Sequence, residues 1–142
     1  MPEPFRKDLR ITNETKNLSL VRQVVGEVLE KTPFGRPEKD KIVLAVDEAV
    51  ANVVEHAYAG ELGNIDIQFI LDDERFEITI RDNGKKFNPE MVATPDIHQH
   101  IKAGLKGGLG MFLMRKIMDE VRYSLDSTYV NELVMVKFWP SA

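Results

Sequence analysis

The sequence contains no cysteine, a single tryptophan and no long run of apolar residues. The missing cysteines exclude disulfides and thiolate metal sites, and no apolar segment approaches the roughly 20 residues that a membrane-spanning helix needs. No signal-peptide pattern stands at the start. Lys and Arg number 19 against 23 Asp and Glu, and the net charge of −4 excludes a strongly basic nucleic-acid footprint. These absences predict a cytoplasmic protein that contacts neither nucleic acid nor membrane.

The 142 residues are enough for one domain that buries its own core. Neither a repeat nor a linker divides the chain, so we expect a single domain over residues 1–142. Hydrophobic periodicity predicts five strands and three helices. The strands are expected at 5–12, 65–71, 76–80, 121–125 and 133–139, and the helices at 13–31, at 37–57 and from 108 onward. Asn13 or Thr15 is expected to cap the first helix.

The predicted second helix carries polar residues along one face. Glu48, Asn52, Glu55 and His56 recur at spacings of three and four, which places them together. Asn52 offers a neutral oxygen to Mg²⁺, which binds oxygen ligands and keeps much of its remaining coordination for water and phosphate. Glu48, one turn earlier, could accept a proton from a nucleophile that attacks a γ-phosphate. The alternative is the solvated face of an amphipathic helix.

Two further segments have the chemistry of a nucleotide site. Asp82 follows a predicted strand and could accept a hydrogen bond from an exocyclic amine, while Gly84 would let the backbone approach a base. An ordinary turn is the alternative. In Gly107-Gly108-Leu109-Gly110 the glycines could expose backbone N–H groups to a phosphate at a helix start. This segment is neither a P-loop nor a dinucleotide fingerprint, and a hinge is the alternative.

The order of these motifs resembles that of the GHKL ATPases, the superfamily of histidine kinases and DNA gyrase. The matching segments are Glu48-x-x-x-Asn52-x-x-x-His56-Ala57-Tyr58, Asp82-x-Gly84-x-x-Phe87-x-Pro89 and Gly107-Gly108-Leu109-Gly110-Met111-Phe112-Leu113. The short chain and the Phe87-Asn88-Pro89 continuation are most similar to the anti-sigma-factor serine/threonine kinases of bacteria. The similarity extends over most of the chain, from Asp40 to Phe138.

The resemblance implies an α/β sandwich (α+β), the Bergerat fold, with a mixed, mostly antiparallel sheet and helices on one face. It implies that Glu48 is the general base, Asn52 the Mg²⁺ ligand and Asp82 the adenine-recognising residue. Gly84 would shape the adenine pocket, and the ATP or ADP phosphates would meet a glycine-rich segment. That segment comprises Lys106, Gly107, Gly108, Leu109 and Gly110. The loop Asn88–Lys106 would be a lid, from which Lys102 could also reach phosphate.

The chain departs from the family pattern before its last strand. Many relatives have Gly-Thr there, with the hydroxyl near the base or its ordered water, whereas this chain has Asn131-Glu132. Glu132 would repel a nucleotide if its side chain pointed into the site. The broader superfamily also often has a second glycine where this chain has Lys86, although the anti-sigma branch commonly lacks it.

The resemblance implies a protein serine/threonine kinase that holds a sigma factor and phosphorylates an anti-sigma-factor antagonist. It also implies a homodimer, for which the first strand could supply an edge. One alternative is a module in which ATP only sets the conformation for partner binding. Another is a detached histidine-kinase-like catalytic domain, which we disfavour because no dimerisation and phosphoacceptor helices precede the domain.

Overall fold

The computed structural model describes residues 4–56, 58, 61–84, 110–124 and 131–140. They form one sheet of five strands and three α-helices, with a short 3-10 helix ahead of the first. The strands are β1 (Phe5–Thr12), β2 (Asn64–Leu71), β3 (Arg75–Asp82), β4 (Glu120–Ser124) and β5 (Asn131–Phe138). The helices are η1 (Thr15–Asn17), α1 (Leu18–Leu29), α2 (Arg36–His56) and α4 (Gly110–Ile117).

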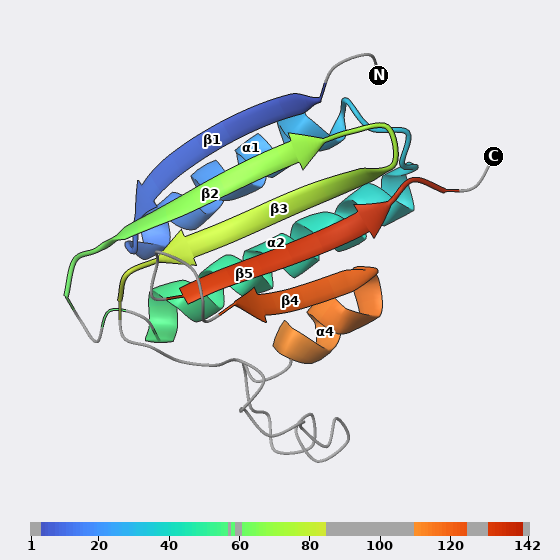
Figure 1. Ribbon diagram of the computed structural model, residues 1–142. Coiled ribbons are helices and arrows are strands. Elements are labelled where there is room, and N and C mark those ends of the chain that lie inside the picture. Colours follow the sequence, from blue (N-terminus) through green and yellow to red (C-terminus); the bar gives the residue numbers. More distant parts are fainter. Residues whose placement is uncertain (1–3, 57, 59–60, 85–109, 125–130, 141–142) are drawn as a thin grey trace.

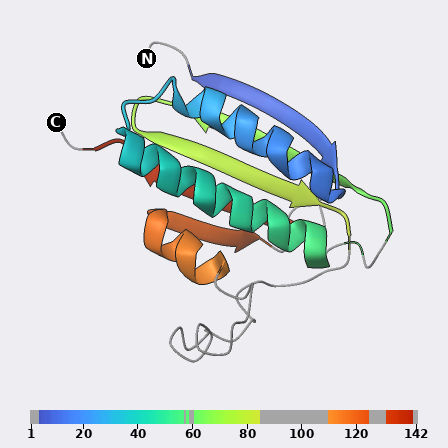
Figure 2. The ribbon, with the colours of Figure 1, turned by 180° about the vertical axis from the view of Figure 1, so that it is seen from behind.

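The strands lie in the order β1-β2-β3-β5-β4. All four pairings between described strands are antiparallel, in keeping with the mostly antiparallel sheet that was expected, and no parallel pair occurs among the described strands. The helices α1, α2 and α4 cover the same face, which gives the expected two-layer α/β sandwich (Figures 1 and 2). Among the described residues, no helix combines the length and apolar character that crossing a bilayer requires.

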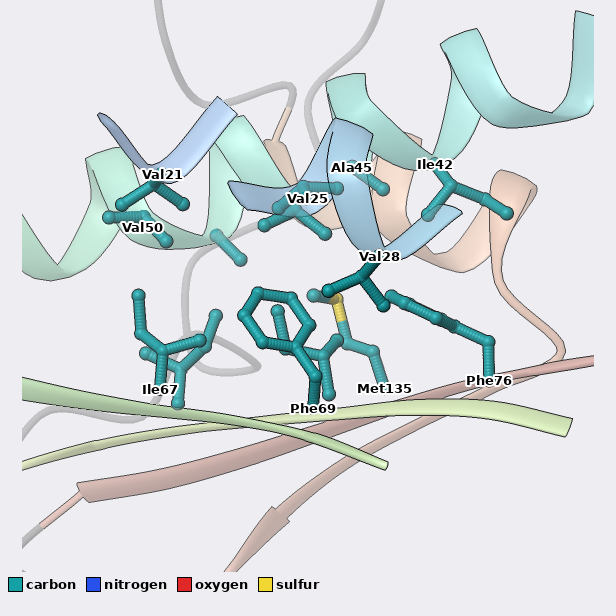
Figure 3. Close-up of a cluster of buried hydrophobic side chains, with 14 of the residues drawn as sticks. Val21, Val25, Val28, Ile42, Ala45, Val50, Ile67, Phe69, Phe76 and Met135 are labelled. Atoms are coloured by element: carbon teal, nitrogen blue, oxygen red, sulfur yellow. The ribbon is translucent and has the colours of Figure 1, made fainter. Parts of the chain in front are cut away.

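The core fills the space between the helices and the sheet. Alternate residues of β2 and β3 point toward the helices, and the apolar stripe of α2 faces them (Figure 3). Phe69 and Phe76 pack at a ring-centroid distance of 6.3 Å, and both are fully buried. Burial of such side chains is worth roughly 1.5–3 kcal/mol each. This packing fixes α2 against β3, and these two elements carry the site.

The other face of the sheet is polar and carries opposite charges across neighbouring strands. Arg10 pairs with Asp66 at 2.6 Å, and Arg81 pairs with Glu132 at 2.6 Å. The register places these four residues in one row across β1, β2, β3 and β5. Side chains alternate between the faces of a sheet, so the neighbours Asp82 and Asn131 must face the helices.

The start of the first helix lacks the predicted side-chain cap. Neither the residue before η1 nor the residue before α1 makes a side-chain capping bond. Asn13 instead donates its side-chain amide to the Glu61 carbonyl at 2.8 Å and accepts from the Gly63 N–H at 3.0 Å. The expectation that Asn13 or Thr15 caps the helix was therefore wrong, and Asn13 secures the segment that leads into β2.

Candidate functional site

The polar residues of α2 and β3 meet at the end of the sheet where β3 finishes and β5 begins. This end lies beside the C-terminal half of α2 (Figure 1). A pocket opens there with an empty volume of about 280 Å³, part of it open to solvent. Its lining is apolar apart from four polar side chains. The residues that line it are Ala49, Asn52, Val53, Ile80, Asp82, Tyr123, Asn131 and Leu133.

Asp82 is the last residue of β3 and is only 1% exposed. Its Oδ1 accepts hydrogen bonds from the Gly84 N–H at 3.0 Å and from Asn131 Nδ2 at 2.9 Å. Its Oδ2 is buried and has no hydrogen-bond partner among the described residues. A buried acceptor of this kind costs free energy unless a ligand pairs with it. Asp82 Oδ2 is therefore an acceptor with which a hydrogen-bond donor of a ligand can pair.

Burial raises the pKa of Asp82 above its ordinary value, whereas the hydrogen bonds from Asn131 and Gly84 act in the opposite direction. Gly84 is not one of the described residues that line the pocket. It contributes through its N–H, which is one of the two donors that hold the carboxylate in place.

The turn after Asp82 is fixed by a tyrosine that lies two residues beyond α2. The Tyr58 hydroxyl donates to the Asn64 carbonyl at 2.5 Å and accepts from the Asn83 N–H at 3.1 Å. Its ring lies so close to Gly63 that a Cβ there would come within 2.4 Å of ring atoms. Tyr58 was quoted in the sequence only as part of a motif. The structure shows that it joins the start of β2 to the end of β3.

The helix α2 places Glu48 and Asn52 one turn apart, and both are half-buried. Asn52 lines the pocket with Asp82, so the structure brings these two predicted site residues together. Glu48 lies one turn before Asn52 and is not among the described residues that line the pocket. Burial raises the pKa of Glu48, and the negative charge of Asp47 raises it further. Glu55 is exposed, so it does not share the half-buried environment of Glu48 and Asn52.

The predicted phosphate segment is only partly described. Gly110 is the first residue of α4. Lys106, Gly107, Gly108 and Leu109 lie outside the described residues, as do Lys102 and the whole of the predicted lid 88–106. No group of three or more His, Cys, Asp or Glu that could hold a metal occurs in the part of the chain that the structure describes. A metal near Asn52 would depend on oxygens that the nucleotide supplies.

The register of β3 and β5 decides on which face of the sheet Asn131 and Glu132 lie, the two residues that replace the Gly-Thr of many relatives. Asp82 is opposite Asn131 and Arg81 is opposite Glu132. Asn131 is therefore on the pocket side, 3% exposed, and Glu132 is on the far face of the sheet in its ion pair with Arg81. Glu132 does not point into the site, so its charge gives no reason to expect repulsion of a nucleotide.

Sequence patterns missed two polar residues of this pocket. Tyr123 on β4 donates its hydroxyl to Asn131 Oδ1, and Asn131 in turn donates to Asp82. Asn131 had been noted only as a departure from a motif, and Tyr123 carried no signal at all. Their proximity follows from the pairing of β4 with β5 and of β5 with β3.

Comparison with known proteins identifies the family of this chain. Residues 11–137 match the family model of the histidine kinase-like ATPase domain. The chain is 30% identical to the serine-protein kinase RsbW of Bacillus mycoides (strain KBAB4) over 131 residues, which covers 89% of this chain and 82% of that protein. The RsbW proteins of Bacillus cereus strains AH187 and ATCC 10987 / NRS 248 are 30% and 29% identical over the same coverage. The chain therefore belongs to the histidine kinase-like ATPase domain family, in the branch that contains the RsbW serine-protein kinases.

Proposed function

We propose that this protein is an ATP-dependent protein serine/threonine kinase and an anti-sigma factor. It would hold a sigma factor and phosphorylate a Ser or Thr of an anti-sigma-factor antagonist. The observation that carries the proposal is the buried Asp82, whose Oδ2 has no partner among the described residues, in a pocket shared with Asn52. Identity to proteins named serine-protein kinases supports the reaction class.

The lining of the pocket has the chemistry that a purine base requires. Ala49 and Val53 of α2 form one wall, and Ile80 and Leu133 of the sheet form the other. Apolar walls with few polar groups are typical of small-molecule sites. The base would lie between these walls, with its exocyclic amine donating to Asp82 Oδ2. The phosphates would then extend toward Asn52 and the proposed segment from Lys106 to Gly110.

Asn52 is the residue that would hold Mg²⁺. Its side-chain oxygen is a neutral hard ligand, and Mg²⁺ commonly combines one or two protein oxygens with substrate phosphates and water. When bound, the ion would neutralise charge on the transferring phosphoryl group. Glu48 would accept the proton of the attacking hydroxyl. Its raised pKa makes it a stronger base than an exposed glutamate.

We expect the protein to bind ATP, with an affinity that drops when EDTA removes Mg²⁺. Asn52→Ala should lower the affinity at least about tenfold in Mg²⁺, because a ligand of the ion is lost, and little in EDTA. Calorimetry on the purified protein measures the ATP affinity in Mg²⁺ and in EDTA. An affinity that is identical with and without Mg²⁺ would remove Asn52 from its role. Absence of binding at millimolar nucleotide would contradict the ATP site altogether.

The partners and the assembly are proposed on the same basis. The sigma factor and the antagonist would compete for the protein, so phosphorylation of the antagonist would decide whether the sigma factor is held. We also propose a cytoplasmic homodimer, to which the edge strand β1 could contribute. Light scattering should give twice the 16.2 kDa mass of one chain. A monomer at high concentration would count against the dimer and leave the site unaffected.

A further inference from the structure

A line of hydrogen bonds crosses three strands at the floor of the pocket. The Tyr123 hydroxyl of β4 donates to Asn131 Oδ1 of β5, and Asn131 Nδ2 donates to Asp82 Oδ1 of β3 at 2.9 Å. Tyr123 of β4 is opposite Leu133 of β5, so its hydroxyl reaches Asn131 along the diagonal of the antiparallel pair. This line is separate from the Gly84 N–H, which also donates to Asp82 Oδ1.

The direction of each bond fixes the next. The ionised carboxylate of Asp82 can only accept, so the amide nitrogen of Asn131 faces it, and the amide oxygen is left to accept from the Tyr123 hydroxyl. A flipped amide would set its oxygen against a carboxylate that can only accept hydrogen bonds. Oδ1 of Asp82 therefore receives two donors from the protein. Oδ2 is buried and receives none from the described residues.

We propose that Tyr123 and Asn131 are positioning residues that determine purine specificity, by presenting Asp82 Oδ2 as a pure acceptor that selects 6-amino over 6-oxo purines. The inference rests on the ATP site proposed above. An ionised carboxylate accepts the 6-amino group of adenine. It is repelled by the 6-oxo oxygen of hypoxanthine or guanine, which is itself an acceptor. A site that leaves a buried polar group mispaired rejects the wrong ligand strongly.

Asn131 also favours the ionised form of Asp82, in which both carboxylate oxygens can only accept hydrogen bonds. Burial raises the pKa of Asp82, and the bond from Asn131 opposes that rise by stabilising the ionised form. Among the residues that the structure describes, the hydroxyls of Tyr58 and Tyr123 interact electrostatically with Asp82, and both have raised pKa values and stay neutral. Without the Asn131 amide, Asp82 would hold a proton more readily. A protonated Asp82 could donate to a 6-oxo group and lose its discrimination.

The test compares the dissociation constants of ATP and inosine triphosphate, which differ at the 6-position and the adjoining ring nitrogen. Wild type should prefer ATP. Asn131→Leu, which keeps the side-chain size and removes the amide, should reduce the preference at least about tenfold. Tyr123→Phe should reduce it by a smaller factor, because the amide remains but is no longer oriented. Glu132→Gln is the matched control: it is the adjacent residue on the opposite face and should leave the preference unchanged.

The outcomes separate this inference from the ATP site itself. If wild type prefers ATP and both Asn131→Leu and Tyr123→Phe keep that preference in full, the inference fails and the ATP site stands. If wild type binds neither nucleotide, the proposed site fails and the inference fails with it. Tyr123→Phe removes a single oxygen atom, so it provides a folded variant if Asn131→Leu is too unstable to assay.

Discussion

Glu48→Gln should slow phosphoryl transfer to the antagonist protein by roughly 10²–10⁴-fold and leave ATP affinity close to that of wild type. A general base acts on the attacking hydroxyl and has little to do with ATP in the ground state. The substitution keeps the shape of the side chain and removes its charge. Single-turnover phosphorylation at saturating ATP, combined with calorimetry, measures the two quantities separately.

The chain offers a close control on the same helix. Glu55→Gln makes the same chemical change two turns further along α2, at an exposed position. It should leave both the rate and the ATP affinity unchanged. If wild type and Glu48→Gln bind ATP equally and neither phosphorylates a cognate antagonist, the protein is a nucleotide-gated binding module. Glu48 would then be a residue of the helix face with no part in catalysis.

The pH dependence of the reaction gives a second measure of Glu48. Its pKa is raised by burial and by the neighbouring Asp47 charge, and a base works only when it is ionised. The wild-type rate should therefore rise as the pH rises through this elevated pKa. Glu48→Gln should lose that rising limb. A wild-type rate that is flat from acidic to neutral pH would contradict the role of Glu48 as the base.

Periodicity in the sequence predicted the five described strands and the three described α-helices, but not the short 3-10 helix η1 ahead of α1. The strand at 5–12 coincides with β1, and the helix at 37–57 differs from α2 by one residue at each end. These elements are governed by local patterns, because the face of a helix or strand that packs on the core must be apolar along its own length. The grouping of Asn52 with Asp82 in one nucleotide site came from the chemistry and order of the motifs and from the family resemblance, and not from periodicity.

Contacts between distant segments could not be predicted in this way. The side chain of Asn13 binds Glu61 and Gly63, which are about fifty residues away, and this choice overrides its capping preference. The face on which Asn131 lies depends on the register of β5 against β3, where a shift of one residue would exchange it with Glu132. A motif in the sequence predicts neither the Asn13 contacts nor the register of β5 against β3. The hydrogen bonds among Asp82, Asn131 and Tyr123 in the pocket depend on that register.

Asp82→Asn should weaken ATP binding by about 1–3 kcal/mol, a factor of roughly 5–150, and leave the free protein at least as stable as wild type. The amide would place an N–H₂ or an exchanged oxygen against the 6-amino group, so the site loses its pure acceptor. The stability follows from the raised pKa of Asp82, which means that burial of its charge costs more than its two hydrogen bonds return. Calorimetry and thermal unfolding measure the two effects on the same samples.

The stability difference should depend on pH in a definite direction. A raised pKa means that Asp82 favours folding while it is protonated, below its ordinary value of 3.8, and that this contribution is lost as the pH rises through the folded-state pKa. The advantage of Asp82→Asn should therefore be largest at neutral pH and shrink on acidification. ATP binding to wild type should weaken over the same range, because protonated Asp82 is no longer a pure acceptor.

Asp72→Ala is a control that should change stability and leave ATP affinity unchanged, the reverse of what is expected for Asp82→Asn. Asp72 Oδ1 accepts from the Glu74 and Arg75 N–H groups in the turn between β2 and β3, at 2.7 and 2.9 Å. Its loss should lower the free energy of unfolding by roughly 1–2 kcal/mol and leave ATP affinity unchanged. If Asp82→Asn instead behaves like Asp72→Ala, with lower stability and normal ATP affinity, then Asp82 is a structural residue. Its buried Oδ2 would not be the atom that recognises the base.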